Sequence, residues 1–163
     1  MLKHKHLLAM CAVVSLPLSL AAQDAELPVD PYIISNENAD AKPLTQSNTF
    51  EAFNGQAGID RIVDDLVDRI TVDPRIEGIF RASDLVRLRR TLKEQFCYIL
   101  NGPCDYTGRN MVDAHRDHGI TSREFNALVE SLQIAMNTEG VPFRHQNKLI
   151  AKLAPMKRDT VTR

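Results

Sequence analysis

Apolar residues recur at three- and four-residue intervals along most of this chain, a spacing that places them on one face of a helix. Such stripes cover residues 59–70, 85–101 and 121–139, and a further helix is expected over about 142–153. Polar and charged residues occupy the positions between the stripes. Alternation of apolar and polar residues, the pattern of a half-buried strand, is essentially absent. The pattern therefore predicts an all-α fold.

Residues that cap helices mark several of the expected boundaries. Asp73-Pro74 predicts the start of a short helix that runs toward Phe80, because aspartate caps a helix and proline fits its first turn. Ser83 or Asp84 is expected to cap the helix that follows. Residues 121–124, Thr-Ser-Arg-Glu, have the form of a capping box.

The segment 101–119 does not follow the helical pattern. It is long, contains glycine and proline, and has few apolar residues. A generic helical bundle, which the stripes alone equally allow, has little use for such a segment. The segment contains His115, and a neutral imidazole is a common ligand of haem iron. An isolated loop histidine is more often an exposed side chain, so the surrounding residues decide between the two interpretations.

Short motifs in a fixed order separate this chain from a generic bundle. They are Ile62-Val63-Asp64-Asp65, Asp73-Pro74-Arg75-Ile76, Phe80, Leu85 to Phe96, Gly102-Pro103-Cys104, Tyr106-Thr107-Gly108-Arg109, Ala114-His115, Gly119-Ile120, Gly140-Val141-Pro142 and Leu153-Ala154-Pro155-Met156. Their order and spacing resemble the group I truncated haemoglobins over residues 50–161. The family's two Gly-Gly turns read Asn54-Gly55 and Asn101-Gly102 here. Asparagine tolerates left-handed backbone, so we expect both turns to persist.

The resemblance implies a truncated globin domain over residues 50–163, folded as a two-over-two helical sandwich. It implies haem b as the cofactor and His115 as the proximal ligand of the iron. Met111 and Phe125 are expected to line the proximal wall, and Phe80 to pack on the porphyrin face. Without the resemblance, these apolar residues would be interpreted as ordinary core.

The resemblance also assigns the distal side and the rim of the pocket. Leu88 and Leu92 match positions that face the bound gas, and Val67 stands where many relatives carry a tyrosine that hydrogen-bonds it. Arg87 matches a rim position where a guanidinium meets a haem propionate, and two loop residues, Tyr106 and Arg109, are further candidates for that role. Each of these three would otherwise be interpreted as an ordinary solvated side chain.

The distal pocket is therefore expected to be apolar. Gln95, three residues past Leu92, is the only evident polar side chain that could replace the missing tyrosine. His118 and His145 match no ligand position and are expected to be exposed.

The first residues have the features of a secretory signal peptide. Lys3 and Lys5 precede an apolar run that is interrupted by Pro17 and is shorter than the roughly 20 residues of a membrane span. Small residues before position 22 favour cleavage after Ala21 or Ala22. We therefore expect residues 1–21 to be removed and the mature chain to be exported to the periplasm without a stable membrane anchor.

The next segment, residues 22–49, is expected to be an exposed acidic leader or linker. It contains three prolines among Asp, Asn, Ser and Thr, and Lys42 is its only basic residue. The mature chain is mildly acidic, because both lysines of the signal peptide leave with it and no acidic residue does. A basic patch typical of nucleic-acid binding is not evident.

Two cysteines remain in the mature chain, Cys97 and Cys104. Seven positions separate them, and a folded-back loop can bring such a pair within disulfide range. Two unpaired cysteines, with Cys97 packed as a small apolar residue, are equally compatible with the sequence. Zinc is disfavoured because the chain has no CxxC motif and no histidine pair at metal spacing.

The resemblance implies a haem protein that reversibly binds a diatomic gas: oxygen, nitric oxide or carbon monoxide. It also suggests dioxygenation of nitric oxide to nitrate, which requires an external reductase because the chain has no flavin or nicotinamide motif. The alternative is an exported helical module that has lost haem and binds a protein partner. Such a module is expected to have lost some of the pocket residues, whereas His115, Phe80 and the distal leucines are all present.

Overall fold

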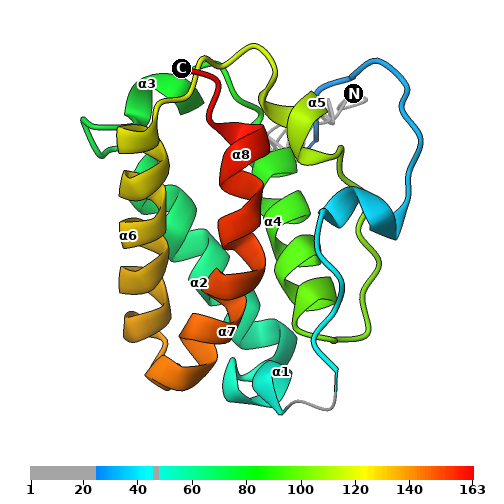
Figure 1. The fold of residues 1–163 in the computed structure, drawn as a ribbon, viewed down its shortest axis with the longest axis vertical. Helices are drawn as coiled ribbons and strands as arrows, with labels where there is room; N and C mark the ends of the chain where they lie inside the picture. The colour runs from blue at the N-terminus through cyan, green and yellow to red at the C-terminus, as the bar shows by residue number, and fades with distance from the viewer. Residues whose placement is uncertain (1–24, 46–47) are drawn as a thin grey trace, which may run out of the picture.

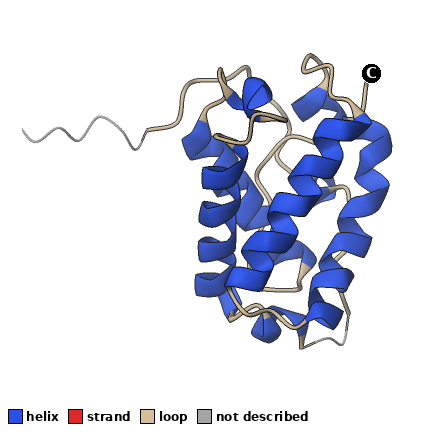
Figure 2. Ribbon diagram, turned by 90° about the vertical axis from the view of Figure 1, so that its left-hand side faces the viewer, coloured by secondary structure: helices blue, strands red, loops and turns tan. Residues whose placement is uncertain are grey.

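The computed structural model describes residues 25–45 and 48–163, and within these ranges the regular structure is entirely helical (Figures 1 and 2). The predicted signal peptide lies outside the described residues. The elements are η1 (Asn36–Ala39), α1 (Thr49–Ala52), α2 (Gly55–Ile70), α3 (Glu77–Phe80), α4 (Leu85–Ile99), α5 (Met111–His115), α6 (Ser122–Thr138), α7 (Phe143–Leu153), η2 (Ala154–Met156) and α8 (Lys157–Thr160). No helix in the described part of the chain is long and apolar enough to cross a membrane.

The four long helices form two antiparallel pairs. Helix α2 packs against both α4 and α6, and the run from α7 to α8 returns alongside α6 (Figure 1). The apolar stripe of α2 enters the core completely, as Ile62, Leu66 and Ile70 show. From the end of α4 the chain runs back along that helix to α5, near the opposite end of the fold (Figure 1). The expected all-α, two-over-two helical sandwich is confirmed.

Most of the predicted helix ends are found. The Asp84 carboxylate accepts a hydrogen bond from the Arg87 amide at 3.0 Å and caps α4. Thr121 and Glu124 form the complete capping box of α6. Both asparagine turns adopt left-handed backbone, with φ of 60° at Asn54 and 66° at Asn101.

The start of α3 was predicted too early. The helix begins at Glu77, and the residues after Asp73 form a turn. The Asp73 carboxylate is held by Arg75, whose backbone amide donates to it at 2.9 Å. Asp73 therefore organises a local turn rather than the first turn of a helix.

His145 was predicted to be exposed, and this prediction is wrong, because the side chain is only 2% exposed. Its Nδ1 lies 3.1 Å from the Thr49 hydroxyl oxygen, and Arg144 Nε donates to its Nε2 at 2.9 Å. His145 shares the inner face of α7 with the fully buried Leu149, one helical turn further on. The polar residues around His145 suggested a surface position, but the helical period places it on the face of α7 that packs against the core.

The buried His145 predicts that acid destabilises the fold. Burial, followed by the charges of Arg144 and Lys148, lowers the pKa of His145. The unfolded chain therefore takes up a proton first, and stability present above about pH 6.5 is lost as the pH falls below it. Urea unfolding at pH 7.5 and pH 5.5 measures the loss, and His145→Gln, which does not titrate, is expected to lose less. An equal loss in both proteins contradicts the assignment to His145.

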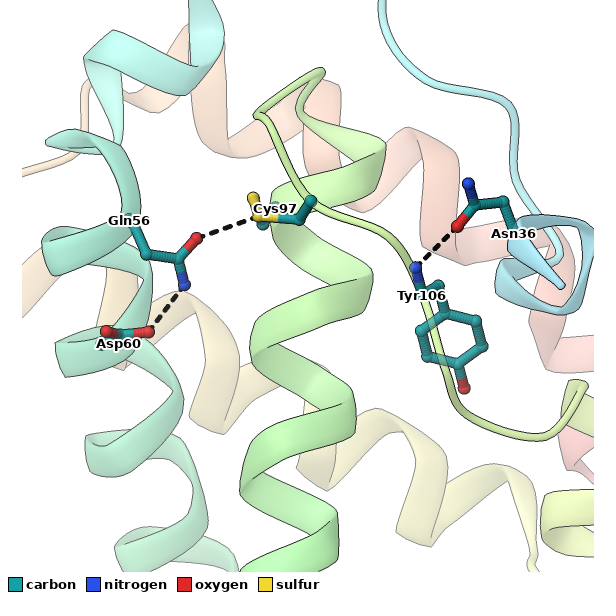
Figure 3. Close-up of a disulfide and its surroundings, with 6 residues drawn as sticks. Asn36, Gln56, Asp60, Cys97 and Tyr106 are labelled. Carbon is teal, nitrogen blue, oxygen red and sulfur yellow. Dashed lines mark hydrogen bonds between the residues drawn. A yellow bond between two sulfur atoms is a disulfide. The ribbon is translucent and has the colours of Figure 1, made fainter. Parts of the chain in front are cut away.

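Cys97 and Cys104 form a disulfide, with 5.9 Å between their Cα atoms (Figure 3). The sequence left this pairing open. Cys97 is fully buried on α4, so the bond ties the start of the following loop to the core. Gly102 lies between them, and an added Cβ there would stand 2.6 Å from Cys97 Sγ, too close for a side chain.

Reducing this disulfide is expected to lower the free energy of unfolding by about 2–3 kcal/mol, because the bond restricts the unfolded chain through a short loop. Urea midpoints of the same protein with and without a thiol reductant give the value. A midpoint that does not move under full reduction, with the thiols counted chemically, contradicts this expectation.

The segment that precedes α1 lies against the domain. Residues 26–40, called the strap below, include η1 and the fully buried Ala39. Beyond the strap, the Leu44 amide donates to the Ile99 carbonyl oxygen at 2.8 Å. Several apolar side chains of the strap are exposed, including Ile33 and Ile34. The prediction of an exposed leader did not anticipate these attachments.

Candidate haem site

His115 ends the short helix α5, which Asn110 caps by accepting a hydrogen bond from the Asp113 amide at 2.8 Å. The His115 Nδ1 atom lies 2.8 Å from the Met111 carbonyl oxygen. A carbonyl oxygen only accepts hydrogen bonds, so Nδ1 carries the proton and Nε2 keeps its lone pair. The second nitrogen is therefore the one available to a metal.

The ring of His115 is half buried, and its surroundings favour the neutral form. Burial lowers the pKa of His115 most, the hydrogen bond to Met111 opposes this, and the charge of nearby His118 lowers it further. The two rings lie 6.4 Å apart between centroids. His118 itself is exposed, as predicted. Only a neutral imidazole can ligate a metal, and these surroundings favour the neutral form of His115.

Most of the apolar side chains predicted to line the pocket are only half buried, whereas Met111 is buried. Phe80 ends α3, and Leu88 and Leu92 lie one turn apart on α4; all three are half buried against the core, which also contains Met111 of α5. Phe125 of α6 is half buried as well. Large apolar side chains inside a domain are usually buried. A flat apolar group such as haem would cover this surface, so the residues present fit the cofactor.

Val67 and Gln95, which were also considered for the distal side, are buried more deeply than Leu88 and Leu92. Val67 of α2 is fully buried within the core. Gln95 is also buried, and its amide nitrogen donates to the Ala39 carbonyl oxygen at 3.1 Å and lies 3.9 Å from Met156 Sδ. Gln95 therefore holds the strap rather than offering a donor to a bound gas.

The three predicted rim residues have other partners. Arg87 Nε donates to the Glu26 carboxylate at 3.2 Å, and Arg87 Nη2 donates to the Leu27 carbonyl. Arg109 donates to the Asp30 carbonyl at 3.1 Å, and its guanidinium lies 5.1 Å from the centre of the Tyr32 ring. The guanidinium groups of Arg87 and Arg109 are thus both engaged by hydrogen bonds to the strap.

Tyr106 belongs to the interior of the loop. It is buried, and its hydroxyl donates to the Arg109 carbonyl oxygen at 2.8 Å. Burial is the main cause that raises its pKa. An added Cβ on Gly108 would stand 2.2 Å from the Tyr106 hydroxyl, so glycine is required for this close approach. Tyr106 therefore shapes the loop that leads to His115.

Sequence reasoning missed Glu94 and Asp40, which hold the loop and α5. Glu94 Oε2 accepts hydrogen bonds from the Thr107 amide at 2.9 Å and from its hydroxyl at 2.7 Å. Asp40 Oδ2 accepts one from the Met111 amide at 2.6 Å. No local pattern signals either contact, because the partners lie far apart along the chain.

The two-over-two helical sandwich, with a half-buried histidine on the short helix α5 and half-buried apolar side chains on α3, α4 and α6, has the features of a truncated globin. This chain belongs to the bacterial-like globin family, whose family model matches residues 48–162. Family membership supports haem, in its usual form haem b, as the cofactor.

Curated relatives agree with this family assignment, and solved structures share the fold. The group 1 truncated haemoglobin of Synechocystis is 31% identical over 112 residues, which cover 66% of this chain and 87% of the relative. That of Mycolicibacterium paratuberculosis is 26% identical over 116 residues, covering 71% and 85%. The truncated haemoglobin of Tetrahymena pyriformis, in its Fe(III) form, superposes with a TM-score of 0.67 at 21% identity, covering 71% of this chain and 98% of that one. The 2/2 haemoglobin of Synechococcus, solved with covalently attached haem, gives 0.65 at 21% identity, with the same coverage.

Proposed function

We propose that this protein binds haem b through His115 Nε2 and reversibly holds a diatomic gas at the iron. One observation carries the proposal: Nδ1 of the half-buried His115 ring lies 2.8 Å from the Met111 carbonyl oxygen, so Nδ1 bears the proton and Nε2 is left to ligate. Burial lowers the pKa of His115 and so favours the neutral ring that ligation needs. When bound, haem would supply an iron atom that can take up oxygen, nitric oxide or carbon monoxide. The chain supplies the ligand and the apolar walls.

The distal residues favour gases that need no hydrogen-bond donor. Leu88 and Leu92 are apolar, Val67 replaces the donor found in many relatives, and the Gln95 amide is held by Ala39. Oxygen gains partial negative charge when it binds haem iron, and a donor stabilises that charge. Carbon monoxide depends on a donor less. We therefore infer that oxygen leaves this protein quickly.

Titration of haem into the mature chain tests the proposal. One haem per chain, with a Soret band that shifts on addition of carbon monoxide to the reduced protein, is the expected result. No saturable binding refutes the proposal and favours the alternative, a haem-free helical module that binds a protein partner.

We also propose that the protein is exported to the periplasm. The Cys97–Cys104 disulfide supports this location, because such bonds persist in oxidising compartments. Mass spectrometry of the native protein is expected to show cleavage after Ala21 or Ala22 and a mass consistent with the disulfide. An uncleaved chain with reduced thiols contradicts the export proposal.

A further inference from the structure

Asp40 links the strap to His115 through a single intervening residue. Asp40 Oδ2 accepts a hydrogen bond from the Met111 amide at 2.6 Å. Met111 begins α5, and its own carbonyl oxygen lies 2.8 Å from Nδ1 of His115. Both polar backbone groups of Met111 are therefore engaged, one by the strap and one by the histidine ring. A shift of Met111 would move the acceptor that sets which nitrogen of His115 carries the proton.

Other strap side chains bind the backbone of the loop that leads to α5. The Tyr106 amide donates to Asn36 Oδ1 at 2.6 Å (Figure 3). The Tyr32 hydroxyl donates to the Thr107 carbonyl at 2.8 Å, and Asn38 Nδ2 donates to the Gly108 carbonyl at 3.1 Å. These backbone groups have side-chain partners in place of helical ones. The strap therefore determines the path of the loop almost residue by residue.

The strap is itself anchored at both ends. Glu26 forms ion pairs with Arg87 and Arg90 of α4, and these pairs lower the pKa of its carboxyl group. At the other end, Ala39 is fully buried and its carbonyl accepts the amide of Gln95. Asp40 follows Ala39 directly, so its carboxylate extends from a fixed point. A fixed acceptor can position Met111, whereas a mobile one could not.

We propose that Asp40 is a positioning residue for the proximal histidine, acting through Met111. This inference rests on the proposed function, in which His115 ligates haem iron. Asp40 lies before residue 48, where the match to the globin family begins, so the contact comes from outside the matched domain. Its hydrogen bond is charge-assisted, and such bonds are roughly twice as strong as neutral ones.

The test compares three variants of the mature chain. Asp40→Ala removes the acceptor, and Asp40→Asn keeps an acceptor oxygen without the charge. Asp30→Ala is the matched control, because Asp30 lies on the same strap and its contact with Arg109 is made by its backbone carbonyl. The haem-free protein is studied by amide exchange at Met111 and by ¹⁵N NMR of the His115 ring. The haem-loaded protein is studied by the iron–histidine stretching frequency and the rate of haem loss.

We expect Asp40→Ala to speed exchange at Met111 and loss of haem by on the order of tenfold each, as for a lost charge-assisted hydrogen bond. The His115 ring should shift away from the Nδ1-protonated form, and the iron–histidine frequency should change. Asp40→Asn keeps a neutral hydrogen bond of roughly half the strength, so it should speed each process by only about threefold. Asp30→Ala should match the native protein.

Faster exchange at Met111 with an unchanged His115 ring overturns the proposal, because the strap would then hold the loop without positioning the histidine. Unchanged exchange in Asp40→Ala overturns it as well. Failure of the native chain to bind haem is a different result, which refutes the proposed function. In that case the NMR and exchange measurements still decide whether Asp40 orders His115.

Discussion

His115→Ala is expected to weaken haem binding by at least about 100-fold. Mutating a residue that only hydrogen-bonds a metal-ligating histidine already lowers metal affinity by about 10–100-fold, so loss of the ligand itself should cost at least as much. The loss should appear in haem titrations and as a displaced Soret band. The apolar walls remain in the variant, so some haem is still expected to associate, without axial ligation from α5.

His118→Ala is the matched control for this change. His118 is three residues further along, exposed, and close enough for its ring to contact that of His115. We expect its removal to leave haem affinity and the Soret band unchanged. Full affinity in His115→Ala, or loss of haem in His118→Ala, would contradict the assignment of the proximal ligand.

Leu92→Gln is expected to slow oxygen dissociation by on the order of tenfold, because a hydrogen bond contributes about 1–1.5 kcal/mol and 1.4 kcal/mol corresponds to a factor of ten. Glutamine is one atom longer than leucine and ends in an amide that can donate a hydrogen bond, and Leu92 is only half buried, so the fold should tolerate the change. Stopped-flow replacement of oxygen by carbon monoxide gives the rate.

Leu92→Met controls for shape, because methionine fills a similar volume without a donor. We expect its oxygen dissociation rate to stay near the native one, and carbon monoxide dissociation to change little in both variants. Equal oxygen rates in Leu92→Gln and the native protein would indicate that another side chain already supplies a donor.

The helices could be predicted from the sequence because their causes are local. The apolar stripes of α2, α4 and α6 and the caps at Asp84 and Thr121 involve residues at most a few turns apart. It was harder to predict which nearby hydrogen bond a polar side chain makes. Asp73 was expected to cap the helix directly, but its carboxylate closes a turn with the Arg75 amide and the helix begins only at Glu77. The helical period puts His145 on the inner face of α7, but the polar residues around it led to the prediction of an exposed side chain.

The strap could not be predicted, because its contacts join residues distant in sequence. Asn36 and Tyr106 are 70 positions apart, and Asp40 and Met111 are 71 apart. The acidic, proline-containing composition of this segment is typical of disordered linkers. Specific contacts offset the tendency to disorder: Glu26 accepts a hydrogen bond from Arg87, and Asp40 accepts one from the Met111 amide. The strap also binds both arginines that the family resemblance proposed for haem propionates, Arg87 through Glu26 and Arg109 through the Asp30 carbonyl.

The site shows the same division between local and distant causes. The motif around His115 singled it out as the candidate ligand, and its hydrogen bond to the Met111 carbonyl joins residues only four positions apart on α5. The deep burial of Val67 and the hydrogen bond from Gln95 to the Ala39 carbonyl could not be predicted, because both depend on packing between separate elements.

Resonance Raman spectroscopy of the ferrous, ligand-free protein tests the central claim most directly. The native chain loaded with haem should show an iron–histidine stretching band. The band should be absent in His115→Gly, return when imidazole is added, and persist in His118→Ala. A band that survives in His115→Gly without imidazole, or no band in the native protein, would contradict ligation by His115.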